Sequence, residues 1–210
     1  MTDEFVERLT RRLHQPLPGA TAQQTMEPEL SFGRHCGPAR FDARPAAVVA
    51  LLHMVQDQWH VPLMLRHESL AYHAGQISLP GGVIELDESS EDAALRELEE
   101  ELGVGRMGVL VLGQLSPLYV FGSNFLITPW VAALRNHAEF RANPAEVQQV
   151  IQAPLPHLLS SASRGQHIEQ RGSLRFRAPH FMLDEHRIWG ATAMVLAEFV
   201  AVVNDVLQSA

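Results

Sequence analysis

Residues 89–102 most constrain what this chain can fold into, because they combine its strongest helical pattern with a crowd of acidic side chains. Leu95, Leu98 and Leu102 recur at helical spacing and predict one buried stripe. A serine pair at the start can cap the helix, and the acids that follow favour the helix dipole. Gly103 is typical of the residue that ends such a helix.

The acidic residues of this helix indicate a cation site. Glu97, Glu100 and Glu101 are spaced i, i+3 and i+4, so their side chains share one side of the helix. Like charges at these spacings repel, which argues against a merely solvated acidic face. A divalent cation removes the repulsion, and hard carboxylate oxygens suit Mg²⁺, Mn²⁺ or Ca²⁺. Arg96 lies four residues before Glu100 and can hold one carboxylate in place.

The rest of the chain predicts strands mixed with a few helices, which favours an α+β fold with a mixed sheet. Residues 1–45 predict a short amphipathic helix and an irregular lead-in, and residues 46–210 predict the main domain. The apolar residues of the short helix are Phe5, Val6, Leu9 and Leu13. The predicted strands cover residues 46–55, 61–66, 108–114, 125–134, 174–183 and 187–190, before a last helix at about 191–207. Residues 136–157 form a polar, proline-containing segment to which no strand is assigned.

Composition narrows the class of protein. The chain has 16 basic and 24 acidic residues and a net charge of −8, which disfavours nucleic-acid binding because phosphate neutralisation needs clustered cations. A single cysteine, Cys36, excludes a disulfide framework and fits a reducing compartment. The apolar stretch at residues 188–207 contains Glu198, Asn204 and Asp205, so it predicts a core helix rather than a membrane span. We therefore expect a cytoplasmic protein that binds neither nucleic acid nor a membrane.

The acidic helix belongs to a longer pattern. Gly82 is followed after five residues by Glu88 and, after seven more, by residues 96–104 with the sequence RELEEELGV. This pattern resembles the Nudix box, the loop–helix–loop signature of the Nudix hydrolases, at every defined position and spacing. The resemblance implies a Nudix-type α/β/α sandwich. It also implies a Mg²⁺- or Mn²⁺-dependent enzyme that hydrolyses the pyrophosphate of a nucleoside diphosphate linked to another moiety.

The resemblance also implies roles for the residues of the box. Glu97 and Glu101 correspond to the principal metal ligands, and Glu100 to a third ligand that binds directly or through water. The backbone carbonyl of Gly81 would complete the site. Substitution of Glu100 or Glu101 by glutamine should therefore abolish turnover with little effect on the fold.

Three further residues are candidates for the chemistry. Arg96 and Glu88 are implied to orient the ligands. Glu146 lies outside the box, in a stretch with few acids. It is either a general base or extra ligand of the late-loop type seen in Nudix enzymes, or a solvated or salt-bridged surface residue.

The residues before the box resemble those of coenzyme A pyrophosphatases. That subgroup carries the motif LLTxRSxxxRxxxGxxxFPGG. The matching residues here are Leu63, Arg66, Gly75, Pro80, Gly81 and Gly82, and the departures are Met64, His67, Ala71 and Leu79. Alanine at position 71 cannot pair with a phosphate as an arginine would. Leu79 could pack either in the core or against the substrate base.

Three residues of this upstream segment are candidate substrate contacts. Arg66 could bind a phosphate or the adenine side of the substrate, or could be an ordinary arginine at a strand end. His73 could donate to a phosphate or brace its loop. Gly75 is a matched position of the motif.

These resemblances imply hydrolysis of coenzyme A or an acyl derivative to 3′,5′-ADP and phosphopantetheine or its acyl form. Cleavage of ADP-ribose, a nucleotide sugar or a dinucleotide is the first alternative, because loops set substrate choice. The second alternative is a non-catalytic Nudix-fold nucleotide sensor. A homodimer is possible, and nothing in the sequence fixes its interface.

Overall fold

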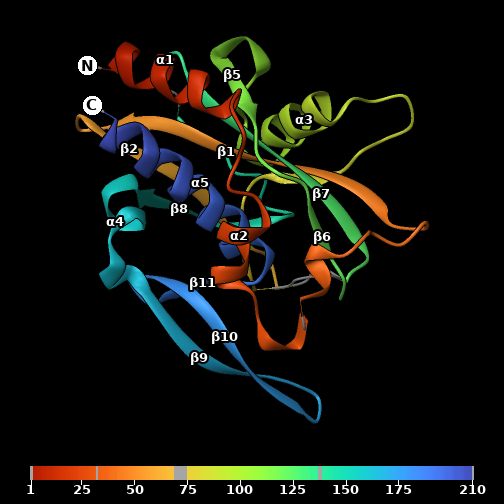
Figure 1. The fold of residues 1–210 in the computed structure, drawn as a ribbon. Coiled ribbons are helices and arrows are strands. Elements are labelled where there is room, and N and C mark those ends of the chain that lie inside the picture. The colour runs from red at the N-terminus through yellow and green to blue at the C-terminus, as the bar shows by residue number, and fades with distance from the viewer. Residues whose placement is uncertain (1, 32, 69–74, 137–138, 210) are drawn as a thin grey trace.

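A computed structural model shows how the chain folds (Figure 1). The described residues are 2–31, 33–68, 75–136 and 139–209. The helices are α1 (Thr2–Leu13), α2 (Ala20–Gln23), α3 (Ser90–Leu102), α4 (Leu155–Leu159) and α5 (Ala191–Gln208). Single 3-10 turns are η1 (Gln24–Met26), η2 (Glu29–Ser31), η3 (Arg34–Cys36), η4 (Arg106–Gly108) and η5 (Ser161–Ser163). The strands are β1 (Arg44–Val55), β2 (Gln58–Arg66), β3 (Ile77–Ser78), β4 (Gly81–Val83), β5 (Val109–Gln114), β6 (Leu118–Val120), β7 (Phe125–Leu134), β8 (Val147–Pro154), β9 (Arg164–Arg171), β10 (Leu174–Leu183) and β11 (His186–Trp189).

Strand β1 organises the larger sheet. Over the described ranges this sheet has eight strands, with the main order β3-β2-β1-β7-β5 and with β4, β6 and β8 pairing with β1, β7 and β2. The pairing of β1 with β7 is parallel, and the other pairs are antiparallel. The predicted mixed sheet is therefore confirmed.

Helices cover both faces of this sheet (Figure 1). Successive side chains of a strand point to opposite faces. Ala47 and Val49 of β1 pack in an apolar cluster with the leucine stripe of α3. Ala50 and Leu52 pack in a second cluster with α5. The arrangement is the predicted α/β/α sandwich, and both faces of β1 are buried.

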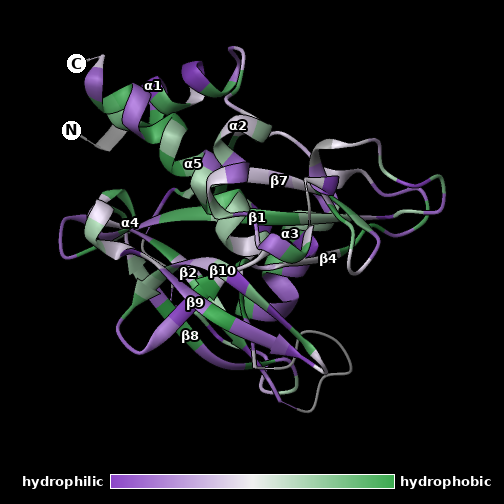
Figure 2. Ribbon diagram, turned by 60° about the horizontal axis from the view of Figure 1, so that its bottom comes forward, coloured by the Kyte–Doolittle hydropathy of each residue, from purple (hydrophilic) through white to green (hydrophobic). Residues whose placement is uncertain are grey.

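Helix α5 is the described helix that, by length and composition, could cross a membrane. The fold buries 61% of that apolar window. Figure 2 shows the helix largely in hydrophobic colours among the other elements. It is a core helix here, as the sequence predicts.

The N-terminal lead-in packs on the main domain. Leu9 and Leu13 of α1 and Met26 of η1 are buried in the same cluster as α5. The Arg12 guanidinium donates to the Asp205 carboxylate at 2.8 Å, so α1 lies along the last turns of α5. The lead-in is also less irregular than predicted, because α2 and three 3-10 turns form within it. The division at residue 45 stays a prediction.

The second sheet contains β11, β10 and β9 in that order and extends beyond α5 (Figure 1). Strands β10 and β11 confirm the predicted pair. The sequence does not predict strand β9, because its residues are mostly polar and none of them is buried.

The prediction that residues 136–157 contain no strand is wrong. This segment holds β8, which pairs with β2 along the sheet edge. Val147, Ile151 and Ala153 of β8 are buried, whereas Gln148, Gln149 and Gln152 are exposed. The polar residues that hide the strand in the sequence point to solvent. Strands β3, β4 and β6 were also missed, and each has only two or three residues.

Candidate active site

Helix α3 begins and ends as its sequence predicts. The Ser89 hydroxyl accepts a hydrogen bond from the Asp92 amide at 3.1 Å and caps the first turn. Gly103 has a φ of 69° and ends the helix in the left-handed conformation, with its amide donating to the Glu99 carbonyl. Leu95, Leu98 and other apolar residues on one side of the helix are buried against the sheet.

Two glycines bring β4 against this helix. The Gly81 amide donates to the Glu101 carboxylate at 2.9 Å. A Cβ on Gly81 would lie 2.3 Å from the Ala47 carbonyl oxygen, and one on Gly82 would lie 2.2 Å from Glu97 Oε1. Side chains at these positions would therefore push β4 away from β1 and from the carboxylates. The Gly-Gly pair places backbone directly against two of the predicted ligands.

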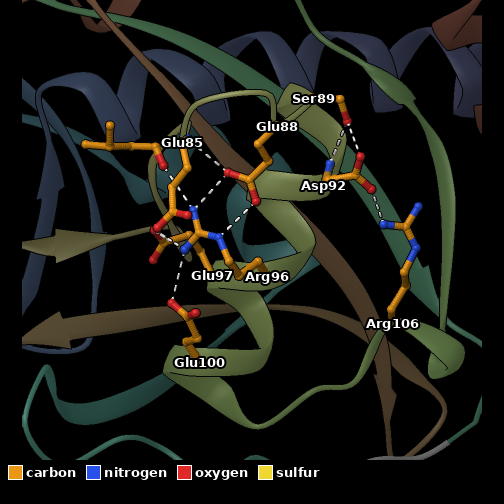
Figure 3. A network of polar contacts seen from close by, with 9 residues as sticks. Glu85, Glu88, Ser89, Asp92, Arg96, Glu97, Glu100 and Arg106 are labelled. Carbon is orange, nitrogen blue, oxygen red and sulfur yellow. Dashed lines mark hydrogen bonds and ion pairs between the residues drawn. The ribbon is translucent and has the colours of Figure 1, made fainter.

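Arg96 is the centre of a network that Figure 3 shows from close by. Its Nε donates to Glu88 at 2.9 Å, and its Nη1 donates to Glu97 at 2.9 Å and to Glu100 at 3.1 Å. Its Nη2 donates to the Val83 carbonyl at 3.0 Å. The guanidinium lowers the pKa of Glu88, and the carboxylates raise the pKa of Arg96, the Glu88 hydrogen bond most strongly. Arg96 thus contacts two predicted ligands, Glu97 and Glu100, and is itself held by Glu88; the orienting roles of Arg96 and Glu88 stay predictions.

The surroundings of Glu101 and Glu97 disfavour the negatively charged form of both carboxylates. Glu101 is 1% exposed, and its burial raises its pKa to about 8, with the charges of Glu97 and Glu146 adding to the shift. Burial also raises the pKa of Glu97, and the charges of Glu100 and Glu146 act in the same direction. Buried carboxylates that face one another accommodate positive charge.

Glu100 differs from its two neighbours. Its side chain is 54% exposed and contacts Arg96. Over the described residues, no three His, Cys, Asp or Glu side chains are gathered into one group that could hold a metal ion. Glu97 and Glu100 are turned to Arg96, while Glu101 is turned to Gly81. The donor set still fits a hard divalent cation, since it is all oxygen and its buried members repel one another.

Arg66 lies at the same site, at the end of β2. Its Nη1 is 3.5 Å from Glu101 Oε1, and its buried Nε has no hydrogen-bond partner among the described residues. The Gly75 amide donates to the Arg66 carbonyl, so Gly75 is also placed at this strand end. His73 and Ala71 lie outside the described residues.

Glu146 reaches the site from the loop before β8. Its half-buried side chain accepts from Asn143 Nδ2 at 3.4 Å, and its carbonyl accepts from the His67 amide at 2.8 Å. Its charge acts on both Glu97 and Glu101. The fold therefore brings Glu146 close to residues of the box that lie about 45 positions earlier in the chain.

Two of the four departures from the coenzyme A motif are core residues. Met64 is 0% exposed and Leu79 is 3% exposed, and each packs in an apolar cluster. Of the two alternatives for Leu79, the structure favours packing in the core. His67 is half-buried and holds Glu146 through its backbone.

Sequence analysis assigns no role to two polar residues that the structure singles out. Asn143 contacts both Glu146 and the end of α3. An asparagine before a proline predicts a turn, and that signal could have drawn attention to it. Glu198 was noted only as an interruption of an apolar stretch, yet it is fully buried and accepts hydrogen bonds from Gly19, Gln23 and Ser116.

A mixed sheet lies between two helical layers, and the Gly81–Gly82 pair of β4 packs against the glutamates of α3. This arrangement is that of a Nudix-type hydrolase. A family model described as NUDIX domain matches residues 43–168, which is more than half of the chain. The chain belongs to the Nudix family. It is a pyrophosphohydrolase, as predicted, and enzymes of this family generally use divalent metals.

Individual relatives indicate the subgroup of the family to which the chain is similar. The uncharacterized Nudix hydrolase NudL of Yersinia enterocolitica is 31% identical over 206 residues, covering 97% of this chain and 100% of that protein. The mitochondrial coenzyme A diphosphatase NUDT8 of Homo sapiens is 34% identical over 168 residues, covering 77% of this chain and 70% of that protein. These relatives confirm the resemblance to the coenzyme A pyrophosphatase-like subgroup.

Solved structures support the fold alone. A MutT/nudix family protein from Enterococcus faecalis superimposes with a TM-score of 0.51 at 18% identity. The match covers 86% of this chain and 69% of that one.

Proposed function

We propose that this enzyme is a Mg²⁺- or Mn²⁺-dependent pyrophosphatase that cleaves coenzyme A or acyl-coenzyme A to 3′,5′-ADP and phosphopantetheine or its acyl form. One observation carries the proposal of a metal-dependent site: Glu97 and Glu101 lie against the Gly81–Gly82 strand, and burial, together with the charge of Glu146, raises the pKa values of both. The substrate is supported by the motif before the box and by the name of the human relative.

Each predicted residue has a proposed role. Glu97, Glu100 and Glu101 would hold the cation, together with the backbone of Gly81. When bound, the cation offsets the charge of the pyrophosphate and makes an adjacent water more acidic. Glu146 would accept the proton of the attacking water, or would serve as a further ligand.

Arg96 would orient the glutamate side chains, and Arg66 and the loop that follows β2 would bind the substrate. Arg96, held by Glu88, would fix the directions of the glutamate side chains. Arg66 would bind a phosphate, which fits its position beside Glu101 and its Nε, for which the described residues provide no hydrogen-bond partner. Gly75 and His73 would contact the substrate from the loop that follows β2.

The burial of Met64 and Leu79 supports coenzyme A over the alternative substrates, since two of the four departures lie in the core. A cytoplasmic location, an absence of nucleic-acid and membrane partners and a possible homodimer stay predictions.

The test is phosphorus NMR of coenzyme A, ADP-ribose, NADH and a diadenosine polyphosphate, each with the enzyme and Mg²⁺ and then Mn²⁺. We expect the coenzyme A pyrophosphate signal to disappear first. Faster loss of the ADP-ribose signal or of a dinucleotide signal would show that this compound, and not coenzyme A, is the preferred substrate. No cleavage with either metal would favour the nucleotide sensor.

A further inference from the structure

Asn143 joins the loop before β8 to the end of α3. Its amide donates to the Glu101 carbonyl at 2.9 Å, and the Arg141 amide donates to the Leu102 carbonyl at 2.8 Å. The last carbonyls of a helix have no partner within the helix, so these bonds complete α3 while they fix the loop. The same helical turn thus carries the Glu101 side chain and anchors the loop.

The side chain of Asn143 faces the other way along the loop, toward Glu146. Its Nδ2 lies 3.4 Å from Glu146 Oε1 and can donate to it, while its Oδ1 accepts from the Ala145 amide at 3.1 Å. The Asn143 carbonyl accepts from the Glu146 amide at 3.1 Å. One residue therefore holds both the backbone and the carboxylate of Glu146.

The glycine that ends the box helix allows this contact. A Cβ on Gly103 would lie 2.9 Å from Arg141 Cβ and 3.2 Å from the Arg141 carbonyl oxygen. The loop can therefore pass close over the helix end only because position 103 has no side chain.

We propose that Asn143 is a positioning residue for Glu146: its backbone fixes the loop to the end of α3, and its amide group directs the Glu146 carboxylate toward Glu97 and Glu101. This inference rests on the proposed function, and on the role of Glu146 in it. A proton acceptor contributes to a reaction only when it is held in the right geometry, so the position of this carboxylate matters as much as its presence.

The two halves of the Asn143 side chain can be tested separately. Asn143→Asp keeps an oxygen that accepts from the Ala145 amide, but it turns a second oxygen toward Glu146 in place of the donor. Asn143→Ser keeps a shorter acceptor for the turn and removes the amide without adding charge. Gln148→Ala, at an exposed position of β8, is the matched control.

The experiment measures kcat, KM and the thermal midpoint of these variants, singly and combined with Glu146→Gln, on the substrate that the unaltered enzyme cleaves fastest. We expect Asn143→Ser to lower kcat about tenfold and Asn143→Asp to lower it more, with KM changed less than about twofold. In the Glu146→Gln background, the loss caused by Asn143→Ser should shrink to less than about twofold. Gln148→Ala should leave kcat and the thermal midpoint unchanged.

The outcomes separate this inference from the proposed function. Unchanged kcat in Asn143→Ser, or an equal loss with and without the Glu146 carboxylate, overturns the positioning role while the proposed function stands. A loss of kcat that follows a lowered thermal midpoint, and that Asn143→Asp does not share, assigns Asn143 to the turn alone and also overturns it. Full activity in Glu146→Gln removes the role of Glu146 and the inference with it. An unaltered enzyme that cleaves no pyrophosphate refutes the proposed function itself.

Discussion

Glu101 in α3 and Glu198 in α5 are both buried carboxylates on helices, but they are surrounded differently. Glu198 is 0% exposed and accepts hydrogen bonds from two backbone amides and a glutamine side chain at 2.9–3.2 Å. Among its described contacts, Glu101 has one amide at 2.9 Å and an arginine only at 3.5 Å. Its other neighbours include two further carboxylates.

The comparison teaches that burial alone does not identify a functional acid. Neutral donors from two segments satisfy Glu198, which therefore ties the lead-in and the turn after β5 to α5. Glu101 is short of donors and lies beside like charges, which is a typical arrangement for a group that needs a cation. Glu198 stabilises the fold, whereas Glu101 is the carboxylate that we propose binds the cation.

The largest expected effect is on activity. Glu101→Gln removes a proposed ligand and should lower kcat/KM by about 10²–10⁴-fold, with a thermal midpoint at or above that of the unaltered enzyme. Steady-state kinetics and thermal unfolding in the same buffer measure both. Activity within about twofold of the unaltered enzyme would contradict the proposed metal site.

The opposite result is expected at Glu198. Glu198→Ala leaves the part-buried Gly19 and Ser116 amides without this acceptor and should cost roughly 2–4 kcal/mol of unfolding free energy. The kcat of the protein that remains folded should hardly change. Urea unfolding followed by far-UV circular dichroism measures the cost. A variant as stable as the parent would refute the structural role assigned to this residue.

The pH dependence sharpens the comparison. The folded pKa of Glu101, about 8, lies above its ordinary value of 4.5, so the folded state holds the proton over that interval. The resulting stabilisation is complete below about pH 4.5 and is lost as the pH rises through about 8. In EDTA, the unaltered protein should lose this contribution as the pH rises from about 4.5 to about 8.

Glu101→Gln should lack that part of the pH dependence. Because a metal ligand must lose its proton, Mn²⁺ affinity should rise over the same interval in the unaltered protein. Urea unfolding and Mn²⁺ titration at several pH values check both statements. A metal affinity that is flat or falling with pH would show that Glu101 is already ionised.

The smallest expected effect lies at the end of α3. Gly103→Ala puts a side chain where φ is 69° and where Arg141 is in close contact, and should cost about 1–2 kcal/mol of unfolding free energy. Because the displaced loop carries Glu146, kcat should also fall severalfold. An alanine at nearby Gly108, which meets no atom within 4 Å, serves as the control.

Much of this architecture follows from local sequence signals. The caps of α3, its buried stripe and the apolar run of β1 are each encoded within a few residues, and all three predictions are confirmed. Local signals do not reveal strands β8 and β9, because exposed polar residues interrupt β8 and make up most of β9, so neither strand has a continuous apolar run.

The residues of the candidate site likewise fall into those that local spacing predicts and those that only the packing of the fold brings together. Helical spacing alone predicts that Glu97, Glu100 and Glu101 share one side of α3 and that Arg96 can reach Glu100. The approach of Arg66 and Glu146 depends on how β2 and the loop before β8 pack, which no local pattern contains. The four hydrogen bonds that Glu198 accepts also join segments far apart in the chain, so no local pattern predicts them.

The parallel pairing of β1 with β7 has a consequence for the order of folding. It joins Arg44 to the level of Phe125, so α3 and β4 lie inside the chain loop that this pairing closes. Closing a long loop costs entropy before its contacts form, which makes such pairings slow. Trp130 of β7 donates its indole N–H to Ser90 at the start of α3, at 3.3 Å, and can report on that step. On refolding, helical signal should return first, and tryptophan fluorescence and activity should return later and together.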